Sequence, residues 1–166
     1  SAMQVQRGLG SSKLAIASVG GTVNIITRAA DRKEAGKVSL GVGNDGYYKT
    51  LFSYNTGKSA KGWASSVLLS RTAGSTYASG TEFEGYNYYF ALGYQPNPKH
   101  DFQFTLTGAP QSHNNRQFEV RLQTLIDLGT TDEPDRRYNA QEGVLNGKEF
   151  NIRSNYYHKP VMSLNW

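Results

Sequence analysis

Hydrophobic and polar residues alternate with a period of two along most of the chain after residue 35. In segment 86–94 the even positions are large and apolar or aromatic, and the odd positions are mostly small or polar, with Tyr89 as the exception. Segment 101–107 repeats the pattern after a turn at 95–99. Because side chains on a strand alternate between its two faces, these segments predict a hairpin with one aromatic-rich apolar face and one polar face.

The same alternation predicts about four further strands, at 36–43, 48–55, 62–71 and 160–166. Asn44-Asp45-Gly46 lies between the first two, and these residue types tolerate the positive φ angles of tight hairpin turns. The sequence therefore predicts an all-β chain of about six antiparallel up-and-down strands. A helix is expected only in segment 116–128, where apolar residues have helical spacing and Gly129 is a suitable stop.

The predicted connections differ in length at the two ends of the strands. Turns after the second and fourth strands are short, whereas loops at 72–85 and 109–155 are long; the first hairpin turn is short although it belongs to the long-loop end. This arrangement, with an apolar outer face and a polar inner face, is typical of an outer-membrane barrel. Aromatic residues near the strand ends fit a belt at the lipid interface: Tyr54, Trp63, Tyr86, Tyr94 and Trp166. The alternative is a soluble β-sandwich, a binding or adhesion module whose apolar face packs on a second sheet.

Composition narrows the possible classes of protein. A chain of 166 residues has room for one core, and without cysteine it has neither disulfides nor cysteine metal ligands. The net charge of +5 comes from scattered basic residues, which argues against nucleic-acid binding. No run of apolar residues is long enough for a membrane-spanning helix. The mean hydropathy of −0.58, together with 12% aromatic residues, fits a sheet whose polar face and loops dominate the average.

No arrangement of side chains in the sequence is typical of catalysis, so we expect neither an enzyme nor a cofactor. His100, His113 and His158 lie far apart and lack the short spacing of metal ligands. His113 and His158 flank the long second loop, so a facing pair that contacts haem or a metal is one interpretation. Ordinary solvated loop histidines are the other.

The first part of the chain, residues 4–34, carries a more specific signal. Gly20-Gly21 precedes a β-branched run over 22–28, which predicts a strand. Together with Arg7-Gly8 and Ser11-Ser12-Lys13-Leu14, this run resembles the end of the plug domain in TonB-dependent outer-membrane receptors. Ala15-Ile16 stand where that family usually has Tyr-Gly, which resembles a Bacteroidetes-type branch. Segments 108–114, 158–160 and 164–165 are also similar to that branch.

The resemblance implies a fold and a function. Residues 4–34 are then the end of the plug, and residues 35–166 about the first six strands of a 22-stranded barrel. Ser1-Ala2-Met3 resembles a tag scar by its own sequence and is left out of the fold prediction. Six strands fall short of the roughly eight that close the smallest membrane barrel. The chain is therefore expected to be a fragment, whose exposed edges invite self-association.

The receptor implied by this resemblance lies in the outer membrane of a Gram-negative bacterium. It imports a siderophore, haem, cobalamin or an oligosaccharide, with energy from a TonB complex acting through N-terminal residues outside this sequence.

Ligand contacts are expected in the two long loops, because loops carry function on rigid barrels and because aromatic and arginine side chains suit such ligands. The candidates are Tyr77, Phe83, His113, Arg116, Arg136, Arg137 and Tyr138. Arg7 and Asn24, in the plug-like segment, are candidates for contacts between plug and barrel. Packing of the loop residues against one another is the alternative for each position.

Overall fold

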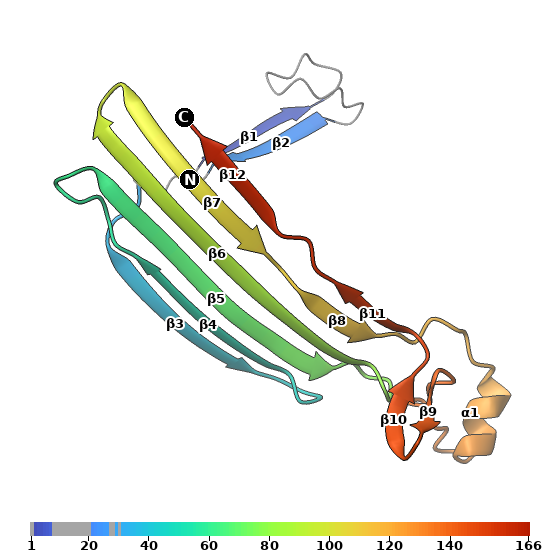
Figure 1. The fold of residues 1–166 in the computed structure, drawn as a ribbon. Helices are drawn as coiled ribbons and strands as arrows, with labels where there is room; N and C mark the ends of the chain where they lie inside the picture. The colour runs from blue at the N-terminus through green and yellow to red at the C-terminus, as the bar shows by residue number, and fades with distance from the viewer. Residues whose placement is uncertain (1, 8–20, 27–28, 30) are drawn as a thin grey trace.

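The chain forms an all-β structure dominated by one open antiparallel sheet (Figure 1). The computed structural model describes residues 2–7, 21–26, 29 and 31–166. The eight strands of the sheet are β3 (Ala35–Val42), β4 (Tyr48–Asn55), β5 (Trp63–Ser75), β6 (Glu82–Asn97), β7 (His100–Gly108), β8 (Gln111–Asn114), β11 (Ser154–Tyr157) and β12 (Val161–Asn165).

The eight strands occupy six rows that follow one another in chain order. β7 and β8 both pair with β6, and β12 and β11 pair with β7 and β8 in turn. Pro110 and Pro160, which have no backbone N–H to donate, lie at the two breaks. The predicted all-β, antiparallel, up-and-down fold is thus confirmed. Within the described residues the sheet does not close, because β3 lies at one edge and β11 and β12 lie at the other.

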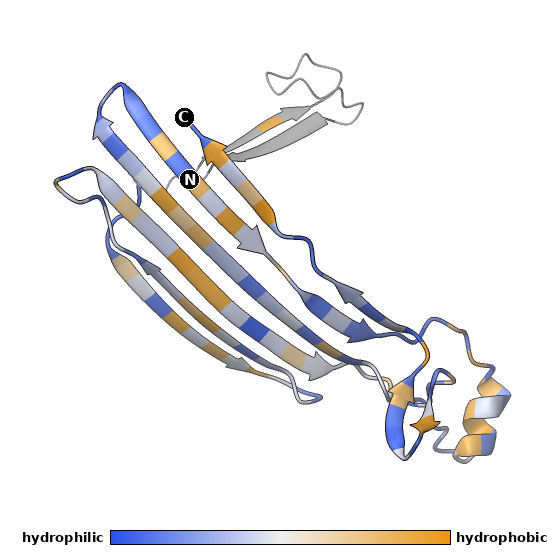
Figure 2. Cartoon of the chain, viewed as in Figure 1, coloured by the Kyte–Doolittle hydropathy of each residue, from blue (hydrophilic) through white to orange (hydrophobic). Residues whose placement is uncertain are grey.

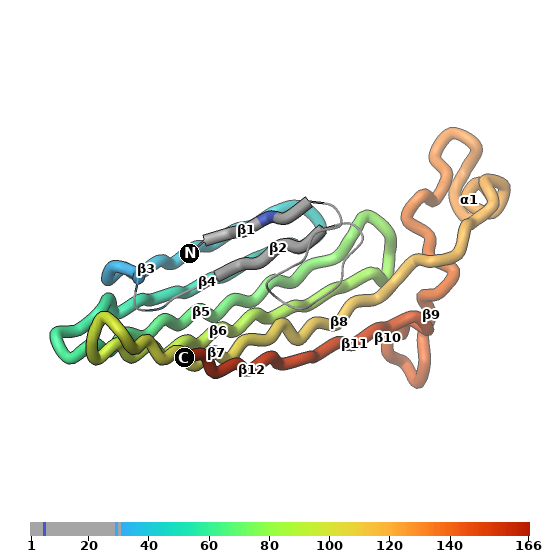
Figure 3. The backbone as a smooth tube through the Cα atoms, turned by 90° about the horizontal axis from the view of Figure 1, so that it is seen from above, coloured from blue at the N-terminus to red at the C-terminus, as the bar shows by residue number. Residues whose placement is uncertain are grey.

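Two strand pairs and a short helix lie outside this sheet. β1 (Ala2–Arg7) pairs with β2 (Gly21–Ile26), and β9 (Glu142–Leu145) pairs with β10 (Lys148–Asn151). A short helix, α1 (Leu122–Leu128), lies in the same excursion as β9 and β10. Figures 1 and 3 both show this excursion projecting beyond one end of the sheet, which we call the loop end.

The two predicted long loops have different bounds in the structure. β5 continues to Ser75 and β6 begins at Glu82, so the predicted loop over 72–85 is wrong and only 76–81 connect them. The second loop is interrupted by β8 and β11, and only 115–153 leave the sheet. The added ends of β5 and β6, and the strands β8 and β11, have polar residues on both faces. Their sequences therefore lack the alternation of apolar and polar residues by which the other strands were predicted.

The first hairpin confirms the predicted turn chemistry. Asp45 and Gly46 have φ angles of 54° and 69°, and the N–H of Gly43 donates to the carbonyl of Tyr47 at 2.9 Å. The helix is confirmed only in part. It covers 122–128, whereas 116–121 are not helical, and the N–H of Gly129 bonds to the carbonyls of Leu125 and Ile126 at its end. None of its residues is buried, which leaves little packing energy to lengthen it.

Burial on the sheet is inverted relative to an ordinary soluble protein. Leu40, Val42 and Leu164 on the apolar face are 77%, 88% and 77% exposed, and Figure 2 shows apolar residues recurring across the strands. On the polar face the small residues Ala64 and Ala91 are only 2% and 0% exposed. They cluster with Ala29, which precedes β3, and with Tyr89, so the chain packs on the polar side of its own sheet.

The N-terminal segment is held to this polar face by a specific contact. The backbone N–H of Ala29 donates to Oε1 of Gln103 on β7, at 3.1 Å and seventy-four residues away in the chain. Gln103 in turn bonds through Nε2 to the Thr105 hydroxyl on the same face. Small residues let the backbone approach closely here, which explains why alanines rather than large apolar residues form the buried cluster.

Candidate functional site

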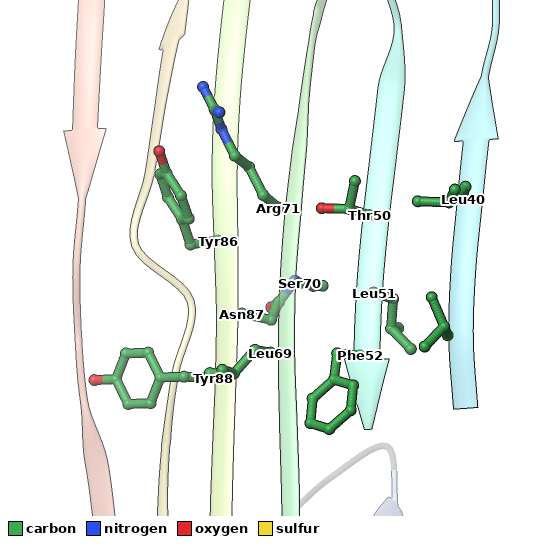
Figure 4. Close-up of a pocket in the computed structure, with 11 residues that line it drawn as sticks. Leu40, Thr50, Leu51, Phe52, Leu69, Ser70, Arg71, Tyr86, Asn87 and Tyr88 are labelled. Carbon is green, nitrogen blue, oxygen red and sulfur yellow. The ribbon is translucent and has the colours of Figure 1, made fainter. Parts of the chain in front are cut away.

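The apolar face carries a groove of about 510 Å³ between β3 and β6 (Figure 4). Its walls are formed by side chains of adjacent strands that the register places opposite one another. Val38 lies opposite Phe52, and Leu69 lies opposite Tyr88. Leu40 on β3 lines the same groove. The lining is almost entirely hydrocarbon and aromatic, so this part of the face suits apolar contacts.

Toward the loop end the groove is bounded by a polar cluster around Arg71 (Figure 4). Glu84 accepts from the Arg71 guanidinium at 2.6 Å and from the Tyr86 hydroxyl at 2.6 Å. The guanidinium also lies over the rings of Tyr48 and Tyr86, 5.3 and 5.7 Å from their centroids. The cation is therefore paired within the cluster and is not a free anion site.

The opposite end of the apolar face carries a band of stacked aromatic rings. Trp63 on β5 stacks on Tyr94 of β6, with centroids 4.3 Å apart. Phe102 on β7 lies 6.5 Å from Tyr94 and 6.3 Å from Trp166. Tyr54 also lies at this end, and Tyr86 lies at the loop end. The structure thus brings three of the five predicted belt aromatics into one band.

At the loop end, two of the predicted ligand contacts lie against each other. The guanidinium of Arg137, in the excursion, lies 5.2 Å from the ring centroid of Tyr77, between β5 and β6. The same group makes an ion pair with Asp45 of the first hairpin turn at 3.2 Å. These groups join three loops, and the contacts of Tyr77 and Arg137 are those of loop packing. Their role as ligand contacts stays a prediction.

Three further candidates lie within the excursion. Arg116 donates from Nη1 to the Arg136 carbonyl at 3.2 Å, which ties the two ends of the α1 segment together. The backbone N–H of Tyr138 donates to the Asp135 carboxylate at 3.1 Å. Arg136 has an exposed side chain, whereas those of Arg116 and Tyr138 are half-buried.

Phe83 and His113 are directly opposite each other on β6 and β8. Together with Thr72, Asn87 and Gln111 they line a depression of about 360 Å³ on the polar face, toward the loop end. This is the one place where two of the predicted contact residues line a common cavity among those described for the structure. An aromatic ring beside an imidazole and an amide suits a ligand with both ring and hydrogen-bonding groups.

The interpretation that His113 and His158 face each other is wrong. His113 lies on the polar face opposite Asn155, whereas Nε2 of His158 lies 3.1 Å from the hydroxyl of Tyr88, whose side chain belongs to the apolar face. Within the described ranges, no group of three or more histidine and acidic side chains is placed to hold a metal ion. Arg7 and Asn24 have their side chains outside the described part of the chain, so the predicted plug contacts stay predictions.

A group of buried amides anchors the excursion, and sequence reasoning missed it. Asn139 donates from Nδ2 to the Ser79 carbonyl at 2.9 Å, and Asn151 donates to the Gly80 carbonyl at 2.7 Å. The side-chain carbonyl of Gln141 accepts from the N–H of Gln117 at 2.7 Å. All three amides are buried. Nothing in the spacing of these polar residues distinguishes them from solvated loop residues, so only the structure identifies them.

Next to these amides three carboxylates converge on a small cavity of about 150 Å³. Glu82 comes from β6, Glu142 from β9 and Glu149 from β10. Burial raises the pKa of the Glu142 carboxyl above its ordinary value of 4.5, and the negative charges of Glu82 and Glu149 raise it further. Asn114 donates to Glu82 at 3.0 Å. The raised pKa of Glu142 makes the junction between the excursion and the 76–81 connection a place to test for pH dependence.

Comparisons of the chain with protein-family models, with curated proteins and with solved structures gave no match. The resemblance of the N-terminal residues to TonB-dependent receptors accordingly stays a prediction. In the described part of the chain, no helix has both the length and the apolar character needed to cross a membrane.

Proposed function

We propose that this chain is part of the wall of an outer-membrane β-barrel, in a receptor of the TonB-dependent type. The receptor would import a siderophore, haem, cobalamin or an oligosaccharide, with energy supplied by a TonB complex. The chain would contribute the eight strands of the main sheet, β3 to β8 with β11 and β12, to the wall. Loops at one end would face the ligand.

The inverted burial of the sheet carries this proposal. Large apolar side chains such as Leu40 and Leu164 are exposed on one face, while the chain packs its alanines and serines on the other. Burying one such leucine is worth about 1.5–3 kcal/mol. A face with many exposed apolar residues is therefore costly in water and is stable against hydrocarbon, the environment of the outer surface of a membrane barrel.

The two ends of the apolar face support the same proposal. The stacked band around Trp63 and Tyr94 at one end, and the Arg71–Glu84–Tyr86 cluster at the other, place amphipathic groups on both sides of the apolar zone. Girdles of aromatic residues at both interfaces are typical of membrane barrels. The loop excursion then lies beyond one girdle, in water.

The soluble sandwich, in contrast, requires a second sheet over the apolar face. Within the described residues, the sheets other than the main one are the pairs β1–β2 and β9–β10, and the apolar face is exposed. The open edge at β3 is a further feature that more strands of a barrel would cover. The structure therefore favours the barrel wall over the sandwich as the proposal to test.

Extraction of the native protein from the producing bacterium tests the proposal. Outer membranes would be isolated and washed with alkaline carbonate, which releases peripheral proteins and leaves integral ones. Retention in the membrane pellet, with release only by detergent, is the expected result. Recovery of the native protein in the wash or in the soluble fraction would contradict it. An integral porin and a peripheral protein from the same cells serve as matched controls.

A further inference from the structure

The polar face of the sheet carries a second, more polar trough that no sequence motif indicates. It has a volume of about 490 Å³, within the range of about 300–1,000 Å³ that is usual for small-molecule sites. Hydroxyl and amide side chains from four neighbouring strands line it, together with Tyr89 and the leucines Leu51 and Leu68; the polar ones include Ser53, Ser66, Ser70, Asn87 and Thr107.

Among the described residues, two cations and no carboxylate line this trough. Lys49 extends from β4, and Arg32 extends from the segment that precedes β3. Among the described residues neither side chain has an ion pair or a hydrogen bond. Because carboxylates are absent from the lining, the electrostatic potential in the trough favours an anion.

One buried hydroxyl in the lining lacks a hydrogen-bond partner. Ser66 is 2% exposed, and its Oγ makes no hydrogen bond, whereas the neighbouring Ser70 accepts one from Asn87 at 3.2 Å. A buried unpaired hydroxyl is destabilising, so such a group usually has a partner in the functional state of a protein. Ser66 lines the same trough as the two cations, so the trough holds a hydroxyl donor without an acceptor as well as unpaired positive charge.

We propose that this trough is a binding site for a carboxylate carried on a hydroxylated molecule or segment. A carboxylate of the ligand would pair with Lys49 or Arg32, the Ser66 hydroxyl would donate to another oxygen of the same ligand, and the ring of Tyr89 would lie against its apolar side. Two sources supply this chemistry: a free acidic sugar, or an acidic side chain from another part of the same protein. This binding site lies on the polar face of the sheet, and it is a property beyond the proposed import function.

The natural full-length protein in detergent, with variants K49Q and S66A, distinguishes these sources. K37Q is the matched control, because Lys37 lies on the same face of the adjacent strand but outside the trough lining. Binding would be measured calorimetrically with trigalacturonate, and with maltotriose as a neutral trisaccharide of the same linkage. The thermal midpoint of each variant would be measured without sugar.

If a free acidic sugar is the ligand, trigalacturonate binds and maltotriose does not, and K49Q weakens binding about tenfold or more, as expected for a charge-assisted contact. If an internal carboxylate is the partner, trigalacturonate does not bind, and K49Q and S66A both lower the thermal midpoint while K37Q leaves it unchanged. A midpoint that is unchanged in K49Q and unchanged or raised in S66A, together with no binding of trigalacturonate, would overturn the proposal.

The result of this binding test does not depend on whether the protein is an integral membrane protein. Binding of the sugar and the thermal midpoints are read in detergent, whereas the proposed function is tested by extraction from native membranes. A protein that fails one test can therefore still pass the other.

Discussion

Trp63 and Tyr94 are direct cross-strand neighbours on β5 and β6, and their rings stack with centroids 4.3 Å apart and planes 23° apart. Such a pair adds about 0.5–1.5 kcal/mol beyond the area it buries. A double-mutant cycle of W63A and Y94A in the full-length protein should return a coupling energy in this range. Unfolding by urea in detergent measures it. Coupling indistinguishable from zero would show that the stack contributes no stability.

The buried amide of Asn151 should hold the excursion to the sheet. Asn151→Ala removes bonds to the Gly80 and Asn115 carbonyls, of which Asn115 keeps its longer bond from Asn139 at 3.4 Å, at a cost of about 1–3 kcal/mol. Hydrogen exchange in 115–153 should therefore accelerate in the variant. Asn155→Ala, at an exposed position on β11, is the control and should leave exchange unchanged. Equal exchange in the two variants would contradict this role.

Glu142 should make docking of the excursion weaken as pH rises. Its carboxyl has a raised pKa in the folded chain, so folding favours the protonated form. The stabilisation is complete below the ordinary pKa of 4.5 and is lost as pH rises through the raised value. Protection factors in 76–81, which are exchange rates corrected for the intrinsic rate at each pH, should fall over this pH interval in the wild type and stay constant in Glu142→Gln. The same pH dependence in both proteins would exclude Glu142 as its source.

Gly46 and Gly143 form a matched pair for testing backbone strain. A Cβ at either position would meet no atom within 4 Å, but only Gly46 has a positive φ, of 69°. Gly46→Ala should destabilise the first hairpin by about 1–2 kcal/mol, because L-residues disfavour this conformation. Gly143→Ala should cost clearly less. Urea unfolding in detergent measures both, and equal losses would mean that φ at Gly46 is not the cause.

The sequence predicted those parts of the fold in which the two faces differ chemically. The alternation in β4, β6 and β7 is strong, and the Asn44-Asp45-Gly46 turn has residues suited to positive φ. β8 and β11 were missed because Gln111–Asn114 and Ser154–Tyr157 lack that contrast. Their pairing depends on continuing the ladder of β6, which no local pattern encodes.

The candidate contacts were predicted less well, because they depend on residues far apart in the chain. Arg137 and Asp45 form an ion pair although they lie ninety-two positions apart in the chain. From the sequence alone, a solvated Arg137 and an ion-paired Arg137 are equally compatible with the residues around it. Phe83 and His113 were both expected in loops and instead pair within the sheet. The unpaired Ser66 hydroxyl is likewise visible only after folding places it in the same trough as the cations.

The central claim, that the apolar face of the sheet contacts lipid, is tested most directly by lipid quenching along β3. These 166 residues contain no cysteine. Single cysteines at 37, 38, 39 and 40 can be labelled with a fluorophore in the native protein in liposomes, with any cysteine elsewhere in that protein replaced by serine. Nitroxide lipids should quench labels at Val38 and Leu40 strongly and those at Lys37 and Ser39 weakly. Weak quenching at all four positions, or quenching without alternation, would contradict the account.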